Sequence, residues 1–207
     1  MYLYQYSKCI KMNIIKIAFF LSILFITGCK SYSTHSIDEK SKIKIDARLL
    51  GTWKAIEDTD TKNCIVVQSY NDLFPNWAPS DVDSVNKDCY YFVTYLNRHG
   101  RNPLYQQFSA FLSKVQNASF LNLHYWDDSV ENGFLLIRII KMNNAADSIT
   151  TALVADSTLK NIQNSASLRQ RISSHLNSSA FYSDTLHFYK VNNVHRSLEE
   201  ARDNANR

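Results

Sequence analysis

The stretch Cys89-Tyr-Tyr-Phe-Val-Thr-Tyr-Leu96 decides the fold class, because aromatic and β-branched residues fill it and favour a pleated strand. Similar runs lie on both sides of it. Residues 61–69 are rich in Val and Ile, residues 134–142 are nearly all apolar, and residues 148–156 form a further run of this kind. Polar turns separate the runs at short spacing, which is typical of an antiparallel meander. The sequence therefore predicts a mainly β fold, either an antiparallel barrel or a strongly curved meander sheet.

Other segments complete this prediction. Residues 105–115 alternate as a strand does, but their apolar residues also fit a helical stripe, so both structures stay open. Residues 157–164 and 167–176 space apolar residues at three and four and begin with serines that can cap a helix. We therefore expect short helices near the C-terminus. Residues 184–191 are expected to be a last strand, and residues 195–207 a polar helix or tail.

The N-terminal segment has the features of a secretory signal. An apolar run covers residues 17–26, follows Lys8, Lys11 and Lys16, and stops shortly before Cys29. A membrane-spanning helix needs about 20 apolar residues, and this run is too short. A positive flank, a short apolar core and small residues at a cleavage point predict a signal peptide.

The sequence Ile26-Thr27-Gly28-Cys29 resembles the bacterial lipoprotein box. The resemblance implies that residues 1–28 are removed, that the Cys29 thiol is diacylated, and that a third acyl chain is often added to its amino group. Several acyl chains together hold a protein stably on a membrane. Met12 also begins a complete signal, so either Met1 or Met12 can be the true start.

The resemblance also implies a location. Lys30, Ser31 and Tyr32 follow Cys29 without an acidic cluster. In lipoproteins of Bacteroidota-like bacteria such a cluster would suggest export to the outer face. By that analogy the protein is an outer-membrane lipoprotein of the cell envelope whose domain faces the periplasm.

The rest of the chain has the size of one domain. Residues 29–46 are polar and without periodicity, and we expect a flexible tether there. The β-rich domain is expected to cover residues 47–194. The net charge of +4 is modest, without the dense Lys and Arg clusters of a nucleic-acid binder.

The motif Gly51-Thr52-Trp53 resembles the Gly-X-Trp signature that opens lipocalin-like barrels. The stretch of residues 108–123 is similar to a hairpin in uncharacterised bacterial proteins with a lipocalin-like domain, although Asn117 and Asn122 replace its usual Gly and Asp. Within residues 48–160 these resemblances imply a lipocalin-like barrel with Gly51 and Trp53 at its closed end.

Arg138 interrupts an otherwise apolar strand. Lipocalin-like barrels often stack an arginine on the opening Trp, which is a cation–π contact. The resemblance therefore implies that Arg138 stacks on Trp53 and helps to close the barrel.

The cysteines divide into two groups. Cys9 belongs to the signal segment and Cys29 is the predicted lipid site, which leaves Cys64 and Cys89. Two cysteines in an oxidising compartment are a candidate disulfide. The alternative is a pair of buried thiols.

Only one neighbourhood gathers acid, base and aromatic groups. His124 lies close to Asp127 and Asp128, and paired carboxylates can do general acid–base work. Adjacent carboxylates in a turn are more often solvated turn residues. Zinc spacing, a phosphate-binding loop and a dinucleotide fingerprint are missing from the sequence. Residues 81–88 alternate oxygen ligands but lack the Gly and Glu of an EF-hand. We expect neither a cofactor nor a metal.

These observations favour a membrane-anchored envelope lipoprotein that binds rather than catalyses. Its partners are expected to be the membrane, through the acyl chains, and either a small apolar ligand or another envelope protein. The alternative is a structural or assembly partner of an envelope complex. A hydrolase that uses His124, Asp127 and Asp128 ranks last.

Overall fold

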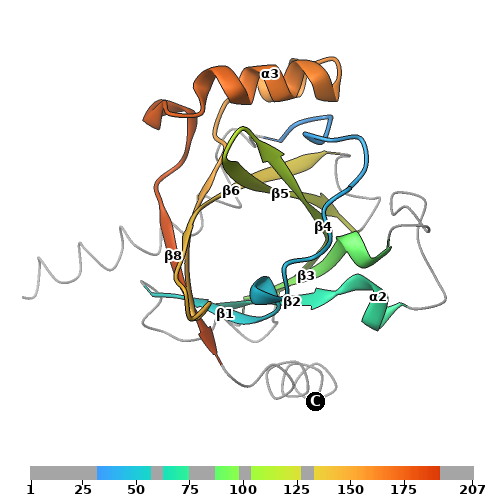
Figure 1. Cartoon of the computed structure of the whole chain (residues 1–207), viewed down its shortest axis with the longest axis vertical. Helices are drawn as coiled ribbons and strands as arrows, with labels where there is room; N and C mark the ends of the chain where they lie inside the picture. Colours follow the sequence, from blue (N-terminus) through green and yellow to red (C-terminus); the bar gives the residue numbers. More distant parts are fainter. Residues whose placement is uncertain (1–31, 57–62, 75–86, 98–103, 127–132, 192–207) are drawn as a thin grey trace, which may run out of the picture. The chain divides into compact units, whose positions relative to one another are not determined.

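Eight strands form a closed antiparallel barrel, in which each strand pairs with the next and β8 pairs with β1 (Figure 1). The computed structural model describes residues 32–56, 63–74, 87–97, 104–126 and 133–191. The strands are β1 (Gly51–Ala55), β2 (Asn63–Ser69), β3 (Tyr90–Asn97), β4 (Leu104–Val115), β5 (Ala118–Tyr125), β6 (Phe134–Met142), β7 (Ser148–Leu153) and β8 (Leu186–Val191). The predicted mainly β, antiparallel barrel is confirmed, with the up-and-down strand order that lipocalin-like barrels share.

The segment that fitted both a strand and a helix is the strand β4. It pairs along its length with β3 and β5, from Asn97↔Leu104 to Val115↔Ala118. The hairpin turn follows at Gln116, whose φ of 54° lies in the left-handed region that tight turns require. Pairing overrides the helical stripe: residues 104–111 pair with β3 and residues 108–115 pair with β5, so the ladders satisfy backbone groups of the segment that a helix would otherwise have to pair.

Two short α-helices and four 3-10 turns precede or connect the described strands. They are α2 (Tyr70–Leu73), α3 (Ser165–His175), and the 3-10 turns η1 (Ala47–Leu49), η2 (Lys87–Cys89), η3 (Leu159–Asn161) and η4 (Ser179–Phe181). The side chain of Asn164 accepts a hydrogen bond from the Ser167 N–H (2.8 Å) and thereby caps α3. The expected C-terminal helices are thus α3 and two shorter turns. Residues 195–207 lie outside the described residues.

Helix α3 lies outside the barrel wall beside β5 and β6 (Figure 1). Phe120 of β5 and Leu136 of β6 pack in one buried cluster with its apolar face. The α3 residues of the cluster are Leu168, Ile172 and Leu176. Since successive strand residues point to opposite faces, Phe120 and Leu136 point outward. Their neighbours Leu121, Leu135 and Ile137 therefore point into the barrel.

An aromatic cluster covers the outer face of β3 and β4 beside α2. Tyr70 of α2 packs there with Phe92 and Phe111, and the rings of Phe74 and Trp126 stack with centroids 5.4 Å apart. Such ring pairs add stability beyond the area they bury. Two outer faces are thus covered, one by α3 and the other by α2 and its aromatic neighbours.

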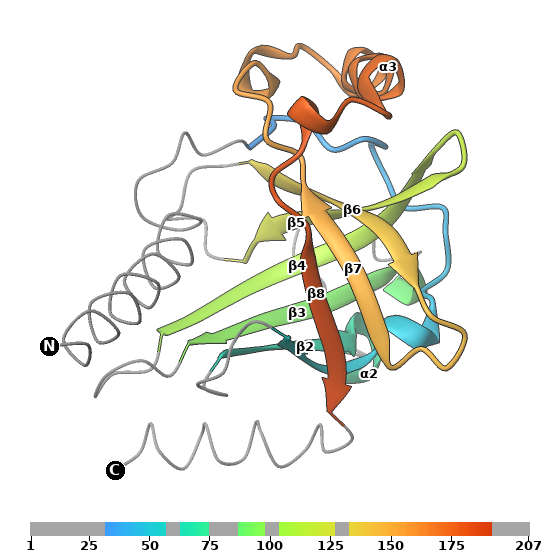
Figure 2. The same cartoon turned by 90° about the vertical axis from the view of Figure 1, so that its left-hand side faces the viewer.

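The segment of residues 32–46, which we call the strap, packs along the outside of the barrel (Figure 2). Ser33 exchanges two backbone hydrogen bonds with Phe134, and Asp38 forms an ion pair with Arg169 of α3. Ile37 is only 1% exposed and packs in the cluster under α3. Residues 32–46 therefore belong to the domain, and the predicted boundary at residue 47 with a flexible tether before it is wrong. Periodicity could not reveal the strap, because single buried residues hold it rather than a regular element.

Asn122 fastens the strap to the barrel. Its buried amide accepts a hydrogen bond from the Ile37 N–H (2.9 Å) and donates to the Phe111 carbonyl (3.2 Å) and to Ser113 Oγ (2.9 Å). An aspartate could accept but not donate in these bonds. The Asn at this position, where the similar hairpins usually carry Asp, is thereby explained.

Candidate ligand site

Trp53 is buried in the interior cluster beside η1, at the end of the barrel that we call the closed end. Its ring is 4% exposed, and its Nε1 donates a hydrogen bond to the Leu49 carbonyl (2.8 Å), so that η1 lies against it. Gly51 precedes it with a φ of 131°, a conformation that residues with a side chain rarely adopt. These two residues set the direction in which the chain enters β1 from η1.

The cation that covers Trp53 is Lys190 rather than Arg138. Lys190 Nζ lies 4.7 Å from the centre of the Trp53 ring and donates to the Arg48 carbonyl (2.7 Å). Arg138 lies over Tyr182 (5.0 Å to the ring centre) and donates to the Leu176 carbonyl (2.6 Å). The predicted stacking of Arg138 on Trp53 is therefore wrong. Residue 138 is two positions from the outward-pointing Leu136 and so points outward as well.

Polar bonds hold η1 over the same end. The Arg48 guanidinium, hydrogen-bonded to the Asp46 carboxylate, keeps the pKa of that carboxyl below its usual value. The Asp46 N–H donates to the Tyr91 hydroxyl (2.6 Å), and burial raises the pKa of Tyr91. Burial also lowers the pKa of Lys190. The polar groups at the closed end thus form hydrogen bonds with one another.

The interior of the barrel is apolar; part of its lining is buried and part retains accessible surface. Inward-pointing side chains that are only partly buried pack against the cluster around Trp53 and Phe108. They are Ile65, Val67, Tyr95, Leu121, Tyr125, Leu135, Ile137, Ile139, Met142 and Phe188. By contrast, Leu136 on the outer face of β6 is completely buried. A barrel filled by its own side chains would bury the inward residues like any close-packed core. The interior is therefore the candidate ligand site.

Polar groups gather at the end of the interior opposite Trp53, which we call the mouth. Tyr95 of β3 pairs with Gln106 of β4, and Tyr125 of β5 packs on Phe108 with ring centres 4.6 Å apart. Burial raises the pKa of Tyr125. Gln106 Oε1 is buried and has no hydrogen-bond partner among the residues that the structure describes. Residues 57–62, 98–103 and 127–132, which follow β1, β3 and β5 in the sequence, lie outside the described residues.

Sequence reasoning missed Lys190 and Gln106. Lys190 belongs to the expected last strand, and closure of a barrel brings the last strand beside the first, opposite Trp53. Gln106 has the same parity as Phe108 in an alternating segment, so both residues point to one face. The alternation was visible in the sequence, but the two possible structures of the segment kept its meaning open.

Cys64 and Cys89 are buried thiols that are not joined. Cys64 lies opposite Leu96 in the ladder of β2 and β3, whereas Cys89 precedes the first residue of β3. Cys89 lies seven residues before Leu96, so Cys64 and Cys89 are roughly 20 Å apart along the strands at the usual rise per residue. This distance is far beyond the reach of a disulfide. The predicted bridge is therefore wrong, and the alternative of two buried thiols holds.

The predicted hydrolase neighbourhood is only partly described. His124 lies on the face of β5 opposite to the interior, with its ring 4.9 Å from that of Phe134. Asp127 and Asp128 lie outside the described residues. His124 thus belongs to the outer wall and does not line the interior site.

A serine and a histidine do lie close together on α3. Ser174 Oγ is 2.9 Å from His175 Nδ1, but Nδ1 is also 3.0 Å from the Arg171 carbonyl. A hydrogen bond to that carbonyl requires a proton on Nδ1, and a protonated Nδ1 cannot accept the proton of a nucleophilic serine. Ser174 instead donates to the same carbonyl (2.9 Å). The pair stabilises the end of the helix.

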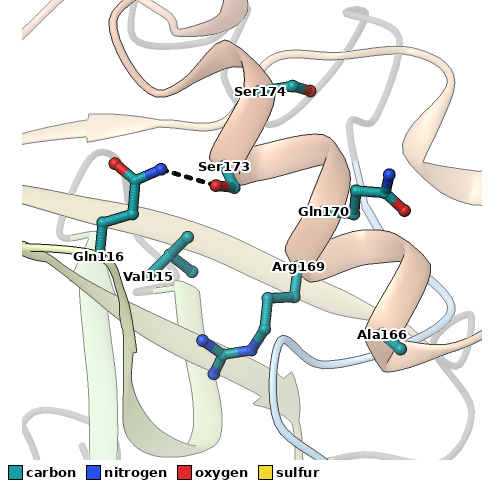
Figure 3. Close-up of a pocket in the computed structure, with 7 residues that line it drawn as sticks. All are labelled: Val115, Gln116, Ala166, Arg169, Gln170, Ser173 and Ser174. Carbon is teal, nitrogen blue, oxygen red and sulfur yellow. Dashed lines mark hydrogen bonds between the residues drawn. The ribbon is translucent and has the colours of Figure 1, made fainter.

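A groove of about 510 Å³ separates α3 from the β4–β5 turn (Figure 3). Gln116 Nε2 donates across it to Ser173 Oγ (2.7 Å), and Arg169 donates to the Lys114 carbonyl (2.6 Å). These bonds engage its polar side chains with the protein itself. Bonds across the groove therefore connect α3 to the barrel, and its polar side chains do not form a second reactive site.

Comparisons with known proteins leave the assignment to the geometry. No family model, no curated protein and no solved structure matches this chain. Across the described ranges, no three His, Cys, Asp or Glu side chains are close enough to hold a metal ion together. The helices of these ranges include none that is long and apolar enough to cross a membrane. Cys29 lies outside the described residues, so its acylation stays a prediction.

Proposed function

We propose that the protein is a membrane-anchored envelope lipoprotein whose barrel binds a small apolar ligand in its interior. The supporting observation is the contrast within β6. Leu135, Ile137 and Ile139 point inward and keep accessible apolar surface, while Leu136 on the outer face is completely buried. Accessible apolar surface enclosed by a barrel is stabilised when a ligand removes it from water.

The lipoprotein box at Cys29 supports the anchored part of the proposal. Acyl chains on Cys29 would hold the domain at the outer membrane, on its periplasmic side. Replacing Cys29 by Ser should release the protein into the soluble fraction of its host. Retention of the Cys29→Ser protein in the membrane fraction would contradict the anchor.

Ligand binding is tested by titrating the domain with N-phenyl-1-naphthylamine, which fluoresces when it enters an apolar site. We expect saturable binding, and we expect Ile137→Trp to weaken it at least about ten-fold because the larger side chain fills the interior. Ile140 is the matched control, since it lies on the same strand and is 45% exposed. Ile140→Trp should bind the probe as the unsubstituted protein does.

Two outcomes would contradict ligand binding. The unsubstituted domain could fail to bind the probe, or both tryptophan variants could bind equally well. Either result would favour the alternative, a structural or assembly partner of an envelope complex with a filled barrel. Native mass spectrometry of the protein from its own host would then be expected to find a protein partner instead of a small molecule.

A further inference from the structure

We propose that the ligand is an amphiphile with an uncharged, hydrogen-bond-donating head group, and that Gln106 at the mouth accepts that bond. This inference rests on the proposed function, because it names the chemistry of the molecule that the interior binds. Its apolar chain would lie along the barrel toward Trp53. A hydroxyl or an amide N–H on the head group would face Gln106 Oε1.

The register places Gln106 inside the barrel. It pairs with Tyr95, which packs with the interior cluster, and it lies two residues before Phe108 of the same cluster. Both relations put its side chain on the inner face, at the end opposite Trp53. Its neighbour Gln107 points the other way and is exposed.

The unpartnered oxygen selects the kind of head group. A buried acceptor without a donor costs free energy, and a ligand that supplies the donor recovers it. An ionised carboxylate has no proton to donate to this oxygen, and it could bind Gln106 only if the amide turned its NH2 group toward it. A hydroxyl or an amide head group supplies the missing hydrogen.

The charges on the described residues also disfavour an anionic head. On the described strands, two cations share the parity of the inward positions, Lys190 of β8 and the exposed Lys114 of β4, and both lie toward the closed end. The Lys190 ammonium is engaged with the Trp53 ring and the Arg48 carbonyl. Among the described inward-pointing residues, none near Gln106 carries a positive charge that would offset the desolvation of a carboxylate there.

The interior also has the length for an alkyl chain. From Gln106 the inward positions of β4 continue through Phe108 and Ala110 to Leu112. These three side chains are buried, and accessible apolar surface for a chain lies on β6, at Leu135, Ile137 and Ile139. At the usual rise per residue the positions from Gln106 to Leu112 span about 20 Å. The side chains below Gln106 on this strand are apolar, so the polar and apolar parts of an amphiphile each meet a matching surface.

The test displaces N-phenyl-1-naphthylamine from the domain at pH 8 with two ligands of equal chain length, dodecanol and dodecanoate. We expect dodecanol to displace the probe at a concentration at least about ten-fold lower than dodecanoate. Gln106→Leu should weaken dodecanol about ten-fold, the effect of one hydrogen bond at a buried site. The probe has an N–H of its own and enters the same interior, so its affinity is measured separately in each variant and the displacement data are corrected for it. Gln107→Leu, the matched control, should leave the affinities for dodecanol and for the probe unchanged.

Each contrary result overturns the inference in a distinct way. Equal affinity for dodecanol and dodecanoate would show that the head group is not selected. Unchanged dodecanol affinity in Gln106→Leu would show that Gln106 accepts no bond from it. If Gln106→Leu loses the probe as well, the hydrocarbon probe 1,6-diphenylhexatriene, which has no N–H, is titrated instead, and loss of that probe too would assign Gln106 to the packing of the barrel. Failure of the unsubstituted domain to bind the probe would instead overturn the proposed function itself.

Discussion

Lys190 Nζ lies 4.7 Å from the centre of the Trp53 ring, and the two residues face each other in the ladder of β1 and β8. The contact joins the first strand of the barrel to the last, so the ring is covered by the strand farthest from it in sequence. The same ammonium donates to the Arg48 carbonyl beside η1. Lys190 thus ties the seam of the barrel to the turn that covers its closed end.

Replacing Lys190 by Met should destabilise the domain by about 1–3 kcal/mol, because it removes a cation–π contact and one charged hydrogen bond. Urea unfolding followed by tryptophan emission measures the change. The exposed Lys141 is a suitable control, and Lys141→Met should stay within about 0.5 kcal/mol of the unsubstituted domain. Equal stability of the two variants would mean that the Trp53 contact contributes nothing.

Arg138→Met should also lower stability, by about 1–3 kcal/mol, but through α3. Its bond to the Leu176 carbonyl and its position over Tyr182 link β6 to the end of that helix. The emission spectrum of the folded protein should not change, since Arg138 points away from Trp53. A shift of the emission spectrum in Arg138→Met as large as that in Lys190→Met would instead support the stacking of Arg138 on Trp53.

The strap should be part of the folding unit. Ile37→Ala is expected to cost about 2–5 kcal/mol, as do other truncations of buried isoleucines. Ile56 is 57% exposed, and Ile56→Ala should change stability by less than about 0.5 kcal/mol. A chain that starts at residue 47 should unfold at lower urea concentration than one that starts at residue 32. Identical midpoints for the two chains would return residues 32–46 to the role of a tether.

The Asp46–Arg48 pair should make stability depend on pH in acid. The pKa of Asp46 is lower in the folded protein than in the unfolded chain, mainly through the side-chain hydrogen bond from Arg48. The stabilisation is therefore present above the unfolded pKa of about 4 and is lost as the pH falls through the folded pKa. Asp46→Asn should flatten this acid dependence while Asn still caps η1. Arg48→Met should flatten it as well, and an unaltered acid limb in both variants would exclude the pair as its source.

The two thiols should behave as buried and unbridged. The pKa of the Cys89 thiol is raised, mainly because the thiol is buried, so little reactive thiolate forms there. We expect both Cys64 and Cys89 to react with a thiol reagent only after unfolding, and reductant should leave the melting temperature unchanged. A melting temperature that falls on addition of reductant would indicate a bridge.

The sequence predicted local features well and contacts between distant segments poorly. The alternation of Cys89–Leu96 and the Gly51-Thr52-Trp53 start indicated the strands and the barrel correctly. The partner of Trp53 was assigned to the wrong cation, because register decides which face a residue occupies and a shift of one residue reverses it. The predicted Cys64–Cys89 bridge was wrong because the redox state of a compartment says nothing about where two cysteines lie along a ladder of strands.

If Cys29 is acylated, as we propose, the strap limits how far the domain can stand from the membrane. Ser33 is hydrogen-bonded to Phe134, the first residue of β6, which pairs with His124 beside the mouth residue Tyr125. Ser33 follows Cys29 by four Cα–Cα steps, so even a fully extended chain reaches only about 14 Å, whereas a free tether to residue 46 would reach about 60 Å. With Cys29 acylated, as we propose, the chain from Cys29 to Ser33 would be a short connection that meets the barrel near the mouth. An amphiphile leaving the bilayer would then have only a short distance of water to cross before it reached Gln106.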